Sequence, residues 1–205
     1  MSGQWLKFTA FWSIFLGIVL FCVLLGGYTS FWRSQSRIKT SKSFLTDACR
    51  ERLDLLPGLV EMEKNCDGIT SLPGINQAAK KADMVLQQVI AREKLLNTAF
   101  VTEFENSQIK LTLRLKDTLT QLETCLDKKY AGRLRGLRQQ FSSAQDNLFM
   151  ARRTYNDEVK YFNTRSRAFP TILIAKLFGF YKIKYMEISK DIFLPAHNVF
   201  TPKAS

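Results

Sequence analysis

The chain has 205 residues, of which 46% are hydrophobic and 23% are charged, with 30 Lys plus Arg against 18 Asp plus Glu. The apolar fraction excludes a wholly disordered chain, and the charged fraction excludes a protein made only of membrane spans. With His197 as the lone histidine, His-rich metal sites and His-dependent triads are not expected. We therefore predict no catalytic, metal-binding or cofactor-binding residues, and no cofactor.

The formal net charge of +12 is unevenly distributed along the chain. Residues 61–127 hold eight basic and ten acidic residues, whereas residues 128–205 hold fifteen and five. A basic region of this kind suits nucleic acid, anionic lipid or an acidic protein. Because no nucleic-acid-reading motif accompanies the charge, we do not expect nucleic acid as the partner.

An uncharged run rich in Phe, Leu, Ile and Val begins at Phe8. At about 1.5 Å per helical residue, residues 8–28 are long enough to cross the ~30 Å hydrocarbon core of a bilayer. A signal peptide has a shorter apolar core of about 7–15 residues and a small-residue cleavage site, which is missing here. We predict an N-terminal membrane anchor over residues 1–32, with a span at about residues 8–28 that contacts the lipid bilayer.

The basic residues that flank the span predict its orientation. Lys7 stands alone before it, whereas four basic residues follow it closely: Arg33, Arg37, Lys39 and Lys42. Because basic flanks stay on the cytoplasmic side, we predict a single-pass protein of the cell membrane with its N-terminus outside and its C-terminal domain in the cytoplasm.

The cysteines beyond the span are odd in number and have no CxxC spacing: Cys49, Cys66 and Cys125. We expect them to be buried thiols, as is usual in a reducing compartment.

The remainder of the chain has helical periodicity after a polar linker at residues 33–43. A first helix over residues 44–60 should bend or break near Leu56, because Pro57 removes a helical hydrogen bond. A loop is predicted at residues 66–74, followed by a helix that starts at Ile75 and extends to Leu96.

Residues 109–115 alternate like a strand, but leucines continue at helical spacing beyond them, so we predict a helix there. The leucines are Leu111, Leu115, Leu119, Leu122 and Leu126. Gly132 and Gly136 indicate a connection after Tyr130. A final helix then carries a seam of residues spaced by three and four from Leu134 to Phe169, and ends at Pro170.

These elements predict an all-α fold, in which a single N-terminal transmembrane helix is followed by an antiparallel bundle of long helices at residues 44–169. Residues 170–205 form an apolar and basic C-terminal segment with two interpretations. It packs against the bundle, or it lies in the membrane interface with Lys176, Lys182 and Lys184 at lipid phosphates. Further basic residues would extend that surface as lipid-facing or partner-binding groups: Arg152, Arg153, Arg165 and Arg167.

Two segments resemble the LemA family. Residues 151–180, ARRTYNDEVKYFNTRSRAFPTILIAKLFGF, are similar to the family's C-terminal signature ARRxYNxxVxxYNxxIxxFPxxLIAxxxGF, and RLDLLPGLVE at residues 52–61 resembles RxDLIPNLVE. The matching positions include Asp54, Pro57, Tyr155, Asn156, Asn163, Phe169, Pro170, Gly179 and Phe180. Departures such as Gly58, in place of an asparagine, indicate a divergent member.

The resemblance implies an anchored, cytoplasmic helical bundle of the bacterial inner membrane, in a family without an established enzymatic activity. The carboxylate pairs Glu61 with Glu63 and Glu103 with Glu105 would face different sides of their helices, so they predict no enzyme. We expect a membrane-anchored, non-enzymatic scaffold or interaction protein that binds a membrane protein, a cytoplasmic protein or a second copy. The alternative is a protein that binds anionic lipid or shapes membranes through the basic C-terminal region.

Overall fold

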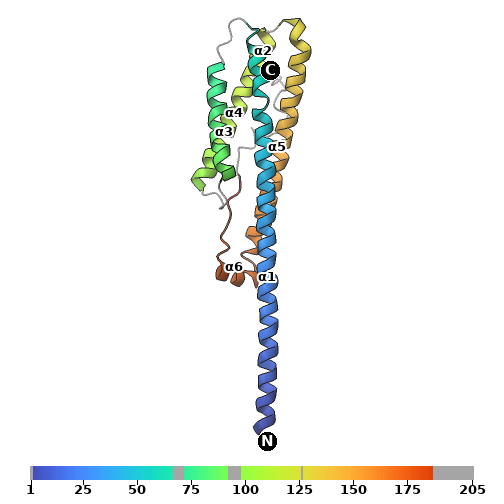
Figure 1. The fold of residues 1–205 in the computed structure, drawn as a ribbon, viewed down its shortest axis with the longest axis vertical. Helices are drawn as coiled ribbons and strands as arrows, with labels where there is room; N and C mark the ends of the chain where they lie inside the picture. Colours follow the sequence, from blue (N-terminus) through green and yellow to red (C-terminus); the bar gives the residue numbers. More distant parts are fainter. Residues whose placement is uncertain (1, 67–71, 92–97, 126, 187–205) are drawn as a thin grey trace, which may run out of the picture. The chain divides into compact units, whose positions relative to one another are not determined.

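The computed structural model describes residues 2–66, 72–91, 98–125 and 127–186. Its elements in chain order are α1 (Ser2–Leu53), α2 (Leu56–Glu63), α3 (Leu72–Ala91), α4 (Thr98–Cys125), the 3₁₀ turn η1 (Lys128–Tyr130), α5 (Ala131–Arg165) and α6 (Thr171–Phe178) (Figure 1). No strand occurs within these described ranges, and the predicted all-α fold is confirmed.

The chain divides into two compact units. The first, here called the anchor unit, comprises Met1–Lys39 and Glu158–Ile183. The second, the bundle unit, comprises Thr40–Asp157 and Lys184–Ser205. Helices α1 and α5 each contribute residues to both units.

The first part of α1 is the one described segment that is long and apolar enough to cross a membrane. Its large apolar side chains from Phe8 to Leu25 are largely exposed, which is the pattern of a helix surrounded by lipid rather than by protein. The structure is therefore consistent with the predicted span at residues 8–28.

The core of the bundle unit is formed by apolar stripes on successive helices. The α4 leucines at 111, 115, 119 and 122 are fully buried and pack in one cluster with Ile75 and Ala82 of α3 and Leu59 of α2. Their burial on one face confirms that residues 109–115 are helical. The loop predicted at residues 66–74 falls partly outside the described residues, and α3 already begins at Leu72.

The break predicted near Leu56 is confirmed, since α1 ends at Leu53 and α2 begins at Leu56. Pro57 lies in the first turn of α2, where the hydrogen bond that proline cannot donate would be absent in any case. The proline thus starts a new helix rather than kinking an existing one.

Residues 33–43, which we predicted to be a linker, are instead part of α1. The hydrophobic periodicity of this part of α1 is incomplete in the sequence, because two of its buried positions are serines. Ser34 and Ser41 are as buried as Ile38 and Leu45. Their spacings of four, three and four give one continuous buried stripe.

The last long helix also has different ends from those predicted. Helix α5 begins at Ala131, so Gly132 and Gly136 lie within it on its exposed side rather than in a connection. It ends at Arg165, and Phe169 is exposed instead of belonging to the seam. Between these limits the predicted seam is largely buried: Leu134, Phe141, Ala144, Leu148, Tyr155 and Phe162.

One expectation about the cysteines is wrong. Cys66 and Cys125 form a disulfide with a Cα–Cα distance of 5.8 Å, which joins the segment after α2 to the end of α4. Cys49 is a buried free thiol, as predicted. The odd number of cysteines therefore does not support a reducing compartment for this domain.

Candidate functional site

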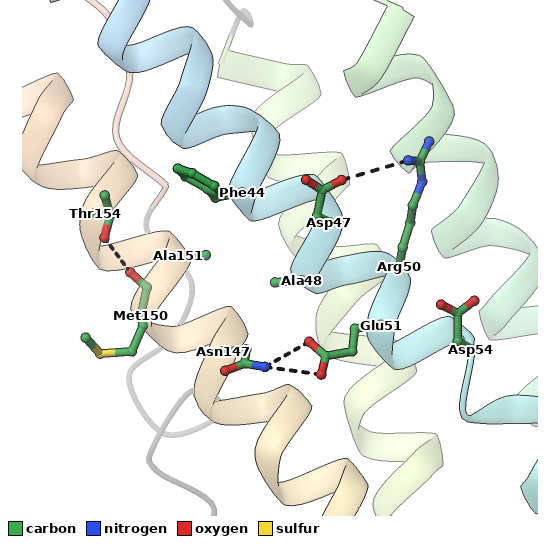
Figure 2. Close-up of a pocket in the computed structure, with 10 residues that line it drawn as sticks. All are labelled: Phe44, Asp47, Ala48, Arg50, Glu51, Asp54, Asn147, Met150, Ala151 and Thr154. Atoms are coloured by element: carbon green, nitrogen blue, oxygen red, sulfur yellow. Dashed lines mark hydrogen bonds and ion pairs between the residues drawn. The ribbon is translucent and has the colours of Figure 1, made fainter.

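A groove in the bundle unit is lined by residues of α1 and α5. Along α1, positions separated by three and four residues place one face toward the groove, and α5 supplies the opposite wall (Figure 2). The lining residues are Phe44, Asp47, Ala48, Arg50, Glu51, Asp54, Asn147, Met150, Ala151 and Thr154.

The groove combines negative charge with exposed apolar side chains. Asn147 Nδ2 donates to both carboxylate oxygens of Glu51, at 3.1 and 2.9 Å, and Arg50 Nη1 lies 3.9 Å from Asp47. Phe44 and Met150 are 58% and 56% exposed. At about 660 Å³ the groove has the size of a ligand pocket but is open to solvent, so it suits side chains of a protein partner better than an enclosed small molecule.

Arg52 lies on another face of α1 and is fully buried. Its Nη2 donates to Thr112 Oγ1 at 2.6 Å and to the Gln108 backbone oxygen at 3.3 Å. Burial lowers the pKa of Arg52 to about 10 and raises that of the neighbouring Cys49 thiol to about 12. Arg52 matches the first residue of the family motif RxDLIPNLVE, and nothing in the sequence indicates that it is buried.

The end of the described chain is held against α5 by asparagine side chains. In the anchor unit, Asn163 Nδ2 donates to the Ile183 backbone oxygen at 2.8 Å, and the Ile183 N–H donates to Asn163 Oδ1 at 2.9 Å. In the bundle unit, Asn156 makes the same pair of contacts with Met186, both at 2.9 Å. Each side-chain amide thus pairs with a peptide unit as a neighbouring strand would.

Aromatic rings gather in the anchor unit near the end of the apolar part of α1. Phe31 stacks on Phe180 with ring centroids 4.8 Å apart and meets Phe162 edge-on at 5.7 Å. Tyr28 lies 4.9 Å from Phe178. Gly179 has a left-handed φ of 70°, which lets the chain turn at the end of α6 and bring Phe180 into this cluster.

The predicted basic residues are distributed over both units: Arg152, Arg153 and Lys184 belong to the bundle unit, and the others belong to the anchor unit. Arg152 is partly buried, which lowers its pKa against the opposing effect of Glu105, and Arg153 lies 4.0 Å from Asp157. Arg165 Nη1 donates to Ser30 Oγ at 2.5 Å. The others differ in exposure: Arg167, Lys176 and Lys182 are exposed, and Lys184 is half-buried.

The family-motif residues separate into structural and exposed positions. Asn156, Asn163, Gly179 and Phe180 hold the C-terminal segment as described above, and the Tyr155 hydroxyl donates to the Lys184 backbone oxygen. Asp54 lines the groove, whereas Phe169 and Pro170 are exposed and joined by a cis peptide bond. Within the described residues, no group of three or more His, Cys, Asp or Glu side chains is placed to hold a metal ion.

The fold and these contacts define a class of protein: an all-helical chain that has, within the part the structure describes, one candidate membrane helix near its N-terminus. The LemA family profile matches residues 43–193, and the chain belongs to the LemA family. No curated protein matches the chain.

Proposed function

We propose that this protein is a membrane-anchored, non-enzymatic interaction protein that recruits another protein through the α1/α5 groove of its bundle unit. The groove carries the proposal because it offers exposed apolar anchors, Phe44 and Met150, beside three carboxylates. Interfaces commonly combine apolar anchors with charge complementarity at their edges. The expected partner segment therefore carries basic and apolar side chains.

The non-enzymatic part of the proposal is supported by what the buried polar groups bond to. Arg52 is directed at Thr112 and the α4 backbone inside the bundle, away from solvent. Tyr155, whose pKa burial raises to about 12, donates to the Lys184 backbone oxygen at 3.5 Å. These groups hold helices and the C-terminal segment in place, and we infer that they have structural roles.

For the membrane topology, we propose a single pass through the bacterial inner membrane with the N-terminus outside. The basic residues after the span favour this orientation. The Cys66–Cys125 disulfide favours the opposite one, because structural disulfides persist mainly in oxidising compartments. We give the basic flank more weight, since a thiol pair can be oxidised or reduced after insertion whereas the flank acts during insertion.

Co-purification of the full chain in mild detergent tests the groove. Phe44→Ala with Glu51→Lys should lose a partner that the wild type recovers, while Met84→Ala, an exposed position on α3, should retain it. Equal recovery by the groove variant and the wild type would contradict the proposal, as would the absence of any partner in several detergents.

The second candidate function is binding of anionic lipid or membrane shaping by the basic C-terminal region. The exposure of Arg167, Lys176 and Lys182 in the anchor unit favours it. This function requires that vesicle binding or deformation increase with the anionic-lipid fraction.

A further inference from the structure

Helix α6 packs directly on the end of the predicted membrane span. A Cβ at Gly27 would overlap Ile174 Cδ1, so the absence of a side chain at Gly27 permits the close approach of α6 to α1. The Tyr28 ring lies 4.9 Å from that of Phe178. Ile174, which contacts α1 at Gly27, and its neighbour Ala175 are buried.

A neighbouring face of α6 is apolar and exposed. Leu173 and Leu177, one helical turn apart, are 60% and 67% exposed, and the flanking Phe169 and Tyr181 are 83% and 82% exposed. Large apolar side chains grouped in this way mark a contact with a membrane or a partner.

The depth of α6 follows from its contacts. A span over residues 8–28 places Gly27 and Tyr28 at the edge of the hydrocarbon core, and Trp32, which is exposed one turn later, at the headgroup level. A helix that touches Gly27 and Tyr28 must lie at that edge. Figure 1 shows α6 beside α1 and roughly across it, as a helix in the membrane plane would be.

We propose that α6 is an interfacial membrane helix, whose exposed Leu173 and Leu177, together with Phe169 and Tyr181 in the flanking chain, are covered by lipid of the leaflet in which the α1 span ends. Lipid is the favoured occupant because this face continues the exposed apolar surface of the span. Lys176 and Lys182 are exposed and are next in sequence to Leu177 and Tyr181. Their long side chains can extend from these positions to lipid phosphates. The inference concerns a different surface from the groove and is independent of the proposed function.

Site-directed spin labelling of the full chain in lipid nanodiscs tests this placement. The background carries Cys22→Ala, since Cys49 is buried and the other two cysteines are disulfide-bonded. One label is placed at Leu177→Cys and a second at Tyr181→Cys, so that the loss of one variant to misfolding leaves the other. Met84→Cys, an exposed position of the bundle unit, is the matched control.

The measurement compares collision of each label with oxygen, which concentrates in lipid, and with a water-soluble nickel complex. We expect the oxygen-to-nickel ratio at positions 177 and 181 to exceed that at position 84 several-fold. A ratio equal to that of position 84 would place α6 in water, and low access to both reagents would place it against a protein or a second copy. Either result overturns the proposal.

Two further conditions separate this proposal from recognition of anionic lipid and from a nonspecific effect. In nanodiscs of neutral phosphatidylcholine alone, the ratio at position 177 should stay high, because the apolar face drives insertion. Gly27→Val should lower it by displacing Ile174 and with it α6. A ratio that rises only with anionic lipid, or that ignores Gly27→Val, would contradict the placement of α6 on the end of the span.

Discussion

Asn163 and Ile183 are joined by two reciprocal hydrogen bonds, in which a side-chain amide takes the part of a neighbouring strand. Asn156 repeats the arrangement with Met186. The two asparagines are seven residues apart, about 10.5 Å of helix, and the two peptide units are three residues apart, about 10 Å of extended chain. This agreement explains why asparagines at this spacing suit an extended segment that follows α5.

Replacing Asn163 should release the segment around Ile183. Asn163→Ala leaves a buried N–H and a buried C=O without their partner, at a cost of about 1–3 kcal/mol for each group. We expect amide hydrogen exchange at Ile183 to accelerate strongly in this variant. The control is Asn147→Ala, since Asn147 is also in α5 but bonds to Glu51 in the contacts described. This variant should leave hydrogen exchange at Ile183 unchanged. Unaltered protection in Asn163→Ala would contradict the role assigned to the side chain.

Arg52 allows a prediction about stability. Its replacement by Met keeps most of the volume, and Gln108 O retains a hydrogen bond from Thr112 Oγ1 at 2.9 Å. Because burial of the charge is unfavourable, Arg52→Met should change the free energy of unfolding by less than about 1 kcal/mol, or raise it by about 1–4 kcal/mol. Arg52→Ala leaves a cavity and should lower it by about 2–5 kcal/mol.

Denaturant unfolding of the full chain in detergent, followed by circular dichroism, measures both changes. If Arg52→Met were as destabilising as Arg52→Ala, the guanidinium hydrogen bonds rather than the packed volume would be the main contribution of this residue.

The Cys49 thiol should make stability fall at alkaline pH. Burial raises its pKa from 9.0 to about 12, so between these values the folded chain keeps a proton that the unfolded chain loses. This contribution of Cys49 to the free energy of unfolding is complete below pH 9. It decreases as pH rises, by at most about 1.4 kcal/mol per pH unit. The difference in unfolding free energy between the wild type and Cys49→Ala should therefore shrink from pH 9 to 11. A constant difference would contradict the burial of a protonated thiol.

Reporter fusions at the C-terminus test the topology. We expect a green fluorescent protein fusion to fluoresce and an alkaline phosphatase fusion to be inactive, because the basic flank of a span, here Arg33 to Lys42, stays on the cytoplasmic side. An active phosphatase fusion together with a non-fluorescent green fluorescent protein fusion would show the reverse orientation.

Periodic apolar residues made most of the fold predictable, whereas polar positions did not. The spacing of the α4 leucines was enough to predict that helix, and Pro57 was enough to predict the break between α1 and α2, because both effects are local. Ser34 and Ser41 are buried in α1 but small and polar, and a composition of this kind is typical of a linker. Gly132 and Gly136 lie within α5 because Leu134 and Leu137 beside them pack in the core of the bundle unit.

Contacts between residues that are far apart in the sequence could not be predicted. Cys66 and Cys125 are 59 positions apart, and no spacing rule pairs them. Phe44 and Met150 come from separate helices, so the groove they flank exists only after α1 and α5 pack. For Asn156 and Asn163 a signal was present, since their spacing of two helical turns indicates one shared face of α5. The groups that this face binds, the backbone of Ile183 and Met186, could not be predicted because they depend on the path of the chain after α6.

Site-specific photo-crosslinking in native membranes tests the central claim, that the α1/α5 groove recruits a partner protein. A photoreactive amino acid in place of Phe44 or Met150 should give the same crosslinked species, and one in place of Met84 should give none. The species should disappear when Glu51→Lys is added, because the partner segment is expected to be basic. Identical crosslinking from positions 44 and 84, or none from either groove position, would contradict the account.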